Sequence, residues 1–175
     1  MANRLLLARL KDVKILLLDV DGVLTDGAIV YDSAGKDMKS FDVHDGMGVA
    51  VLRRCGIPTV LITAKRSQAI RPRAADMQVD KVYDNVKSKA GIVPLLVKKY
   101  GISAGNMCFV GDDLVDIGLM RSVGLPIAVA NACPEVKKAS LWVTSKKGGS
   151  GAVRQVCEAI LKAQGKWRSA IKAYE

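Results

Sequence analysis

The chain has few aromatic residues, and this scarcity bears on what the protein binds. Aromatics make up 5% of the residues, whereas 27 lysines and arginines against 17 acidic residues give a formal net charge of +10. Proteins that bind single-stranded nucleic acid usually combine clustered cations with aromatic platforms for the bases. Here the cations are scattered, so we expect no nucleic-acid partner. The charge favours small phosphorylated ligands, although a solvated basic surface explains it equally well.

The chain also lacks long apolar runs and closely spaced cysteines. No run approaches the roughly 20 residues that a membrane-spanning helix needs, so we expect no membrane partner. The start of the chain contains Arg9 and no small-residue cleavage site, which favours a short helix over a signal peptide. The four cysteines form no Cys-x-x-Cys pair and several lie in apolar stretches. This usage is typical of a reducing compartment, and we predict a cytoplasmic protein.

Short apolar stretches alternate with helical patterns along the chain. Strands are expected at 15–18, 58–63, 81–83, 107–110, 126–130 and 141–143, and helices at 47–55, 67–77, 87–100, 114–123 and 152–164. This alternation predicts an α/β fold, a doubly wound Rossmann-like parallel sheet with helices on both faces, in a single domain of residues 1–175. Two further strands, at 28–32 and 38–43, flank a turn signal and predict a β-hairpin insertion at about 27–43. No insertion is large enough for a cap domain, and a basic tail follows Gly165.

Chemically active side chains follow the expected strands at the points where they end. They are Asp19 and Asp21, Thr63, Asp112 with Asp113, and a lysine, either Lys87 or Lys89, that opens the helix after 81–83. Because the carboxyl ends of parallel strands meet at one edge of a sheet, these groups are expected to converge. Each has an ordinary explanation as a cap, a turn residue or a surface charge. Together they favour a phosphoryl-transfer site, in which Mg²⁺ offsets the carboxylates and the lysine offsets phosphoryl charge.

Four stretches resemble the motifs of the haloacid dehalogenase superfamily of phosphatases. They are Asp19-Val-Asp-Gly-Val-Leu-Thr25, Thr63, Lys89 and Gly111-Asp-Asp-Leu-Val-Asp116. Three further stretches are similar to the branch that acts on 3-deoxy-D-manno-octulosonate 8-phosphate, and they lie at 41–46, 63–73 and 148–154. The resemblance covers nearly the whole chain. It implies a capless phosphomonoesterase that serves the synthesis of the inner sugar of lipopolysaccharide.

The resemblance implies a role for each catalytic residue. Asp19 would be the nucleophile that forms an aspartyl-phosphate, and Asp21 would protonate the leaving alcohol and later activate water. Thr63 would hold a phosphoryl oxygen. Lys89 would neutralise phosphoryl charge, and it is chosen over Lys87 because its distance from Gly111 matches the family.

The resemblance also implies the cofactor and its ligands. Mg²⁺ would bind the carboxylate of Asp19, the backbone carbonyl of Asp21 and the carboxylate of Asp112. Asp113 and Asp116 would lie next to these ligands and help to hold them in position.

The substrate of this branch is a phosphorylated sugar acid, which needs binding groups beyond the phosphoryl site. The candidates are Asp45, Gly46, Lys65, Arg73, Arg154 and, when protonated, His44. The chain departs from the family where His44 replaces an arginine or lysine, where Ala64-Lys65 replaces Gly-Arg, and where Gln155 replaces a glutamate. An equally good interpretation of His44 is an exposed residue at the edge of the hairpin.

The resemblance further implies a homotetramer in which hairpins associate and a neighbour helps to cover each site. Alternating apolar residues at 29, 31, 41 and 43 agree with this, because an isolated hairpin buries them poorly.

Three other functions stay open: a phosphatase of a nonulosonate 9-phosphate, a phosphatase of a nucleotide or nucleic-acid end, and a non-enzymatic phosphate-holding or scaffold domain. Asp21 argues against the last, since such a domain needs no acid/base two residues after the nucleophile.

Overall fold

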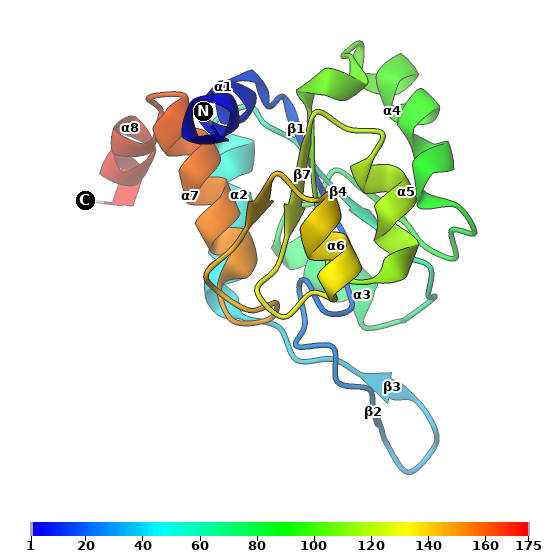
Figure 1. Ribbon diagram of the computed structural model, residues 1–175. Coiled ribbons are helices and arrows are strands. Elements are labelled where there is room, and N and C mark those ends of the chain that lie inside the picture. The colour runs from blue at the N-terminus through cyan, green and yellow to red at the C-terminus, as the bar shows by residue number, and fades with distance from the viewer. Residues whose placement is uncertain (1, 175) are drawn as a thin grey trace.

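A six-stranded parallel sheet forms the centre of the molecule, in the order β5-β4-β1-β6-β7-β8 (Figure 1). The structure, a computed structural model, describes residues 2–174. The strands are β1 Ile15–Leu18, β4 Thr59–Ile62, β5 Lys81–Tyr83, β6 Met107–Gly111, β7 Leu125–Ala128 and β8 Trp142–Val143. The predicted doubly wound parallel sheet is confirmed.

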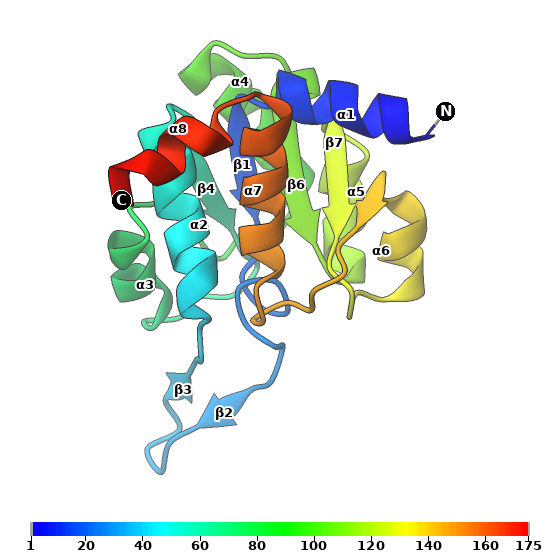
Figure 2. The same ribbon diagram turned by 90° about the vertical axis from the view of Figure 1, so that its left-hand side faces the viewer.

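Helices cover both faces of this sheet. The helices are α1 Ala2–Asp12, α2 Val43–Arg54, α3 Ile70–Asp76, α4 Val93–Tyr100, α5 Ile117–Met120, α6 Pro134–Ala139, α7 Ala152–Ala163 and α8 Trp167–Ile171. α1, α2 and α7 pack on one face, and α4, α5 and α6 lie on the other (Figures 1 and 2). Within residues 2–174, no helix has the length and apolar character needed to cross a bilayer.

The central strands are almost entirely apolar because both of their faces are covered. All four residues of β1 are fully buried, and so are nearly all side chains of β4 and β6. Parallel strands buried on both faces have this unbroken apolar pattern. The strands are therefore fixed firmly, and the polar residues that follow them are held at the carboxyl edge of the sheet.

A small hairpin projects from that edge (Figure 2). It consists of β2, Val30–Tyr31, and β3, Asp37–Met38, paired antiparallel. The predicted insertion is confirmed, but both strands are shorter than expected. The apolar side chains Ile29, Tyr31 and Met38 are exposed in the single chain.

Several other details of the sequence prediction were wrong. α2 begins at Val43 and not at Met47, because the side chain of Asp42 caps the helix by accepting a hydrogen bond of 2.6 Å from the backbone N–H of His44. His44 therefore lies on the first turn of a helix and not on a hairpin strand. The helices expected at 67–77, 87–100 and 114–123 are shorter, with 3₁₀ turns at Lys89–Ile92 and Leu114–Asp116. α6 was missed, and the basic tail contains α8, which packs on α7.

Candidate active site

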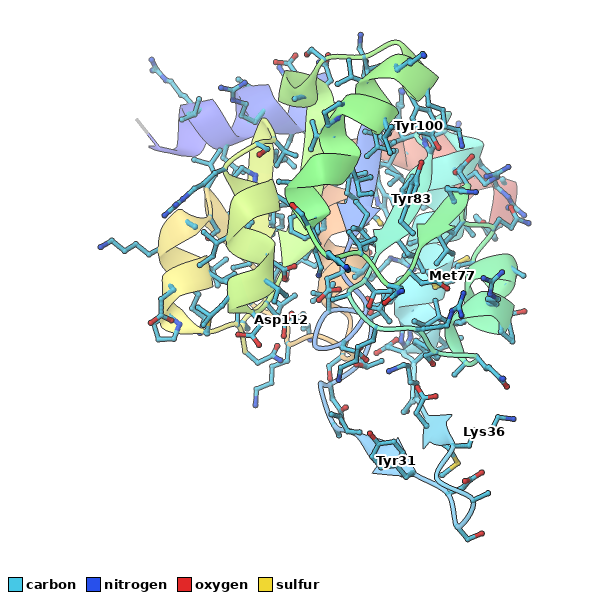
Figure 3. All side chains as sticks on the ribbon, turned by 90° about the vertical axis from the view of Figure 1, so that its right-hand side faces the viewer. Tyr31, Lys36, Met77, Tyr83, Tyr100 and Asp112 are labelled. Carbon is cyan, nitrogen blue, oxygen red and sulfur yellow. The ribbon has the colours of Figure 1, made fainter. Side chains whose placement is uncertain are left out.

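A cavity of about 360 Å³ opens at the carboxyl edge of the sheet. Its lining comprises Asp19, Asp21, Gly27, Ile29, Thr63, Ala64, Lys65, Lys89, Asp112, Asp113 and Val115. Figure 3 shows Asp112 at this edge, on the side from which the hairpin bearing Tyr31 and Lys36 projects. The fold therefore brings the predicted carboxylates, hydroxyl and ammonium together at this edge. Lys87 is exposed and does not line this cavity.

The loop after β1 is shaped so that Asp112 can approach it closely. The hydroxyl of Thr25 accepts hydrogen bonds from the backbone N–H groups of Gly22, at 3.1 Å, and Gly27, at 3.3 Å. Gly22 has a φ of +83°, and a Cβ there would lie 1.9 Å from Oδ2 of Asp112. Glycine at this position thus permits both the turn and the contact between the two loops.

Lys89 is buried between two carboxylates. Its Nζ lies 2.7 Å from Oδ1 of Asp19 and 2.6 Å from Oδ1 of Asp116, and the side chain is 2% exposed. Burial alone would lower the pKa of Lys89, but the two carboxylates raise it. Lys89 is therefore a fixed positive charge beside the oxygen of Asp19.

Asp19 and Asp112 lie together in a poorly solvated place. Burial, with Asp116 adding to it and Lys89 opposing it, raises the pKa of Asp19 to about 6. Burial, and then the charges of Asp19 and Asp116, raise the pKa of Asp112 to about 8. Oδ1 of Asp112 is buried and has no hydrogen-bond partner in the structure. Two crowded carboxylates with a free oxygen are a site for a cation.

This donor set fits Mg²⁺. Carboxylate oxygens of Asp19, Asp112 and Asp116 lie within 4.8 Å of one another. However, Asp116 already uses both of its oxygens: Oδ1 contacts Lys89, and Oδ2 accepts from the backbone N–H of Asp112 at 2.8 Å. Asp19 and Asp112 therefore remain as ligands. Small oxygen sites with one or two carboxylates suit Mg²⁺, which retains water or substrate oxygens.

Asp113 stabilises the local backbone in this arrangement. Its side chain caps the 3₁₀ turn by accepting from the backbone N–H of Leu114 at 2.8 Å, and its own N–H donates to Asp116. It holds Asp116 in place while it lines the cavity. Thr63 is buried, and its hydroxyl accepts from the backbone N–H of Lys65 at 3.2 Å.

Sequence reasoning missed Lys39, which comes from the hairpin and contacts Asp21. Its Nζ pairs with Oδ1 of Asp21 and lies 3.7 Å from Oδ2 of Asp37. The one available signal was the i, i+2 spacing of Asp37 and Lys39, which puts both side chains on one side of the chain where the backbone is extended. That spacing does not identify which distant residue the lysine meets.

The structure places most of the expected substrate-binding residues away from the cavity. Asp45 is fully buried and accepts a hydrogen bond of 2.8 Å from the backbone N–H of Arg154, which ties α2 to α7. A Cβ on Gly46 would lie 2.4 Å from Arg73 Nη2, and Arg73 itself donates to the carbonyl of Asp42 at 2.7 Å. These three residues connect helices and loops within the chain.

The three remaining candidates for substrate binding lie in different surroundings. The side chain of Arg154 pairs with Glu158 at 2.7 Å and stacks on Trp167. His44 is exposed, with its Nδ1 3.1 Å from Oδ1 of Asp42. Lys65 lines the catalytic cavity, and it alone of the substrate-binding candidates does so within residues 2–174. The role of the others in substrate binding stays a prediction.

Comparison with known proteins places this geometry in a family. Residues 51–156 match the model of haloacid dehalogenase-like hydrolases. The chain is 38% identical over 160 residues to the 3-deoxy-D-manno-octulosonate 8-phosphate phosphatase of Escherichia coli strain K12, a match that covers 91% of this chain and 85% of that protein.

Two solved structures are similar over nearly their full lengths. The phosphatase of the same name from Moraxella catarrhalis, in complex with magnesium, phosphate and KDO, is 36% identical with a TM-score of 0.94, covering 99% of each chain. The cobalt-bound deoxy-D-mannose-octulosonate 8-phosphate phosphatase of Haemophilus influenzae is 37% identical with a TM-score of 0.87, covering 91% of this chain and 93% of that one. The chain, with its carboxylates and lysine at one edge of a parallel sheet, belongs to the haloacid dehalogenase-like hydrolases and is a phosphatase of that family.

Proposed function

We propose that the protein is a Mg²⁺-dependent phosphomonoesterase that hydrolyses 3-deoxy-D-manno-octulosonate 8-phosphate to the free sugar acid and phosphate. The observation that carries this proposal is the pairing of Lys89 with Asp19 beside the unpartnered oxygen of Asp112. This arrangement provides a nucleophilic carboxylate, the positive charge of Lys89, and an oxygen of Asp112 that can bind a cation. Two relatives named for that activity match 91% and 99% of the chain.

In the first step, the carboxylate of Asp19 attacks phosphorus and the bond to the sugar oxygen breaks. Asp21 donates its proton to that oxygen, so the sugar leaves as a neutral alcohol and an aspartyl-phosphate forms. Lys89 and the hydroxyl of Thr63 contact the phosphoryl oxygens and stabilise the charge that develops on them. When bound by Asp19 and Asp112, Mg²⁺ supplies further positive charge to the phosphoryl group.

In the second step, water attacks phosphorus and the bond to Asp19 breaks. Asp21, now a carboxylate, accepts a proton from that water and thereby returns to its starting state. Asp19 is released as a carboxylate, and inorganic phosphate leaves. The same residue thus serves as acid and then as base, which requires that its carboxyl group face the reacting oxygen in both steps.

A second cavity supports an acidic substrate. It measures about 490 Å³, and it shares Ile29 and Lys65 with the catalytic cavity. Its cationic lining comprises Lys36, Lys39, Lys65 and Arg66. A sugar acid whose phosphate lies beside Asp19 would direct its carboxylate toward Lys36, Lys65 and Arg66, because Lys39 is already paired with Asp21. These cations are a more direct complement than Arg73 or Arg154. A nonulosonate 9-phosphate is the alternative substrate that this reasoning also admits.

The assembly that fits this proposal is a homotetramer. Ile29, Tyr31 and Met38 are 50–64% exposed on the hairpin, and contact with hairpins of other copies would bury them. A neighbouring chain would then cover the catalytic cavity, which no cap domain covers within the described residues. Light scattering should give about four times the 18.7 kDa chain mass, and Tyr31→Lys should reduce the measured mass. A wild-type monomer with full activity would contradict the assembly.

The experiment that tests the function is a panel of phosphorylated sugars, sugar acids and nucleotides, assayed with Mg²⁺ by release of inorganic phosphate. We expect the eight-carbon sugar acid phosphate to give the highest kcat/KM. Asp19→Asn should remove turnover without loss of the fold, because an amide is a poor nucleophile. A preference for nucleotides would overturn the substrate, and turnover by a folded Asp19→Asn protein would overturn the covalent mechanism.

A further inference from the structure

The hairpin carries a lysine whose charge is not directed to solvent. The side chain of Lys39 is 8% exposed, although it lies on a hairpin whose other side chains are mostly open to water. Burial of an ammonium is costly unless oxygen partners compensate it. Asp21 and Asp37 are its partners, and Asp21 is the proposed acid/base of the reaction.

The contact with Lys39 leaves one carboxyl oxygen of Asp21 available. Oδ1 of Asp21 accepts the hydrogen bond from Lys39, and no described residue in 2–174 forms a hydrogen bond with Oδ2. Asp21 also lines the catalytic cavity, whereas Lys39 lines the adjoining one. One oxygen of Asp21 is therefore held from outside the cavity, and the other is left for the reacting oxygen.

An acid/base group works only while it faces the atom with which it exchanges a proton. Catalytic bases are commonly oriented by a third group that binds the part of the base not engaged with substrate. Here no hydrogen bond or ion pair to any other side chain in residues 2–174 restricts the rotation of the Asp21 carboxyl group. Lys39 is in the position to do so.

We propose that Lys39 is a positioning residue that orients Asp21 for proton transfer, and that the hairpin thereby takes part in the chemical step. The inference rests on the proposed role of Asp21 as acid/base. Asp37, on β3 of the same hairpin, also lies close to the ammonium, with its Oδ2 3.7 Å from Nζ. Displacement of the hairpin would move Lys39 and release Asp21, so the hairpin's position and the acid/base step are coupled.

The test compares leaving groups that differ in their need for a proton. Glycerol 2-phosphate releases an alkoxide that must be protonated, whereas 4-nitrophenyl phosphate releases a phenolate that leaves without help. Single-turnover release of each alcohol is measured with enzyme in excess, for wild type, Lys39→Met, Lys39→Arg and the control Lys98→Met. Lys98 is exposed on α4, lines neither of the two cavities, and forms no ion pair within the described residues.

We expect Lys39→Met to slow release of glycerol by roughly tenfold or more, a part of the roughly 10²–10⁴-fold that acid/base catalysis supplies. Release of 4-nitrophenol should fall much less, Lys39→Arg should recover most of the rate, and Lys98→Met should match wild type. Because the ratio of the two rates on one sample does not depend on the fraction of active protein, partial misfolding does not alter it. An unchanged ratio in Lys39→Met would overturn the proposal.

The same assays separate this inference from the proposed function. Asp21→Asn must change the ratio in the same direction as Lys39→Met and more strongly. If Asp21→Asn leaves the ratio unchanged, the role of Asp21 itself is wrong. If wild type ignores sugar acid phosphates but the ratio responds to both substitutions, the substrate is wrong and the positioning role of Lys39 stands.

Discussion

Replacing Lys89 with methionine removes an ammonium and keeps most of the side-chain volume. Asp19 and Asp116 then lose hydrogen bonds of 2.7 and 2.6 Å from a lysine that is almost fully buried. Removal of one partner from a buried ion pair costs about 3–5 kcal/mol, because the remaining charges are left uncompensated. Two charge-assisted hydrogen bonds at about 1.5–3 kcal/mol each sum to about 3–6 kcal/mol, which agrees with that range.

The loss of stability should depend on pH and on metal in a defined way. Asp19 has a pKa of about 6 in the presence of Lys89, which acts to lower it, so its pKa in the variant is higher still. At pH 8 the variant contains the uncompensated charges, whereas at pH 5 Asp19 binds a proton and the cost shrinks. Mg²⁺ near Asp19 and Asp112 should restore part of the stability at pH 8, since it supplies positive charge in the same cluster.

The assays are urea unfolding and thermal unfolding, both followed by circular dichroism at pH 8 and pH 5, with and without Mg²⁺. For a chain of this size, the expected loss at pH 8 corresponds to a fall in melting temperature of roughly 6–20 °C. Lys87→Met is the control, because Lys87 is exposed and lies two residues away. A variant as stable as wild type at pH 8, or an equal loss at both pH values, would refute the reasoning.

Three further predictions concern burial, backbone conformation and metal choice. Burial raises the pKa of Asp45 from 3.8 to about 6 in the folded protein, so wild type loses stability as the pH rises through this window. Asp45→Asn, which has no charge, should be more stable than wild type by up to about 3 kcal/mol at pH 8, with no advantage below pH 4, as measured by urea unfolding. Gly22→Ala should weaken Mg²⁺ binding measured by calorimetry at least tenfold, on the order of 1.4 kcal/mol, because its Cβ would strike Asp112. Gly27→Ala is its control, since Gly27 has a similar φ of +89° but its Cβ would lie 3.6 Å from the nearest atom, and equal binding by both variants would contradict the argument. Ca²⁺ should bind but support little turnover, because it accepts more oxygen ligands and can hold a carboxylate through both oxygens; comparable rates with Ca²⁺ and Mg²⁺ after chelation would count against the proposed site.

The sequence by itself determined the sheet and the residues at its edge. The apolar runs at 15–18 and 107–110 are unbroken because strands covered on both faces bury every side chain, and a carboxylate follows each run within two residues. Parallel strands bring their carboxyl ends to one edge, so convergence of Asp19, Thr63 and Asp112 follows from order along the chain alone. The start of α2 at Val43 and the presence of α6 had local signals as well, in Asp42 as a cap and Pro134 in the first turn.

Only the tertiary structure decided which charges meet across distant segments. Asp21 and Lys39 are 18 residues apart, and Asp45 and Arg154 are 109 apart. Both acidic residues have the same chemistry in the sequence, yet Asp21 lines a cavity while Asp45 is sealed between α2 and α7. Neighbouring residues set a strand or a helix cap because those interactions are local. Burial of a charge and the identity of its partner depend on how whole elements pack, and no short stretch of sequence contains that information.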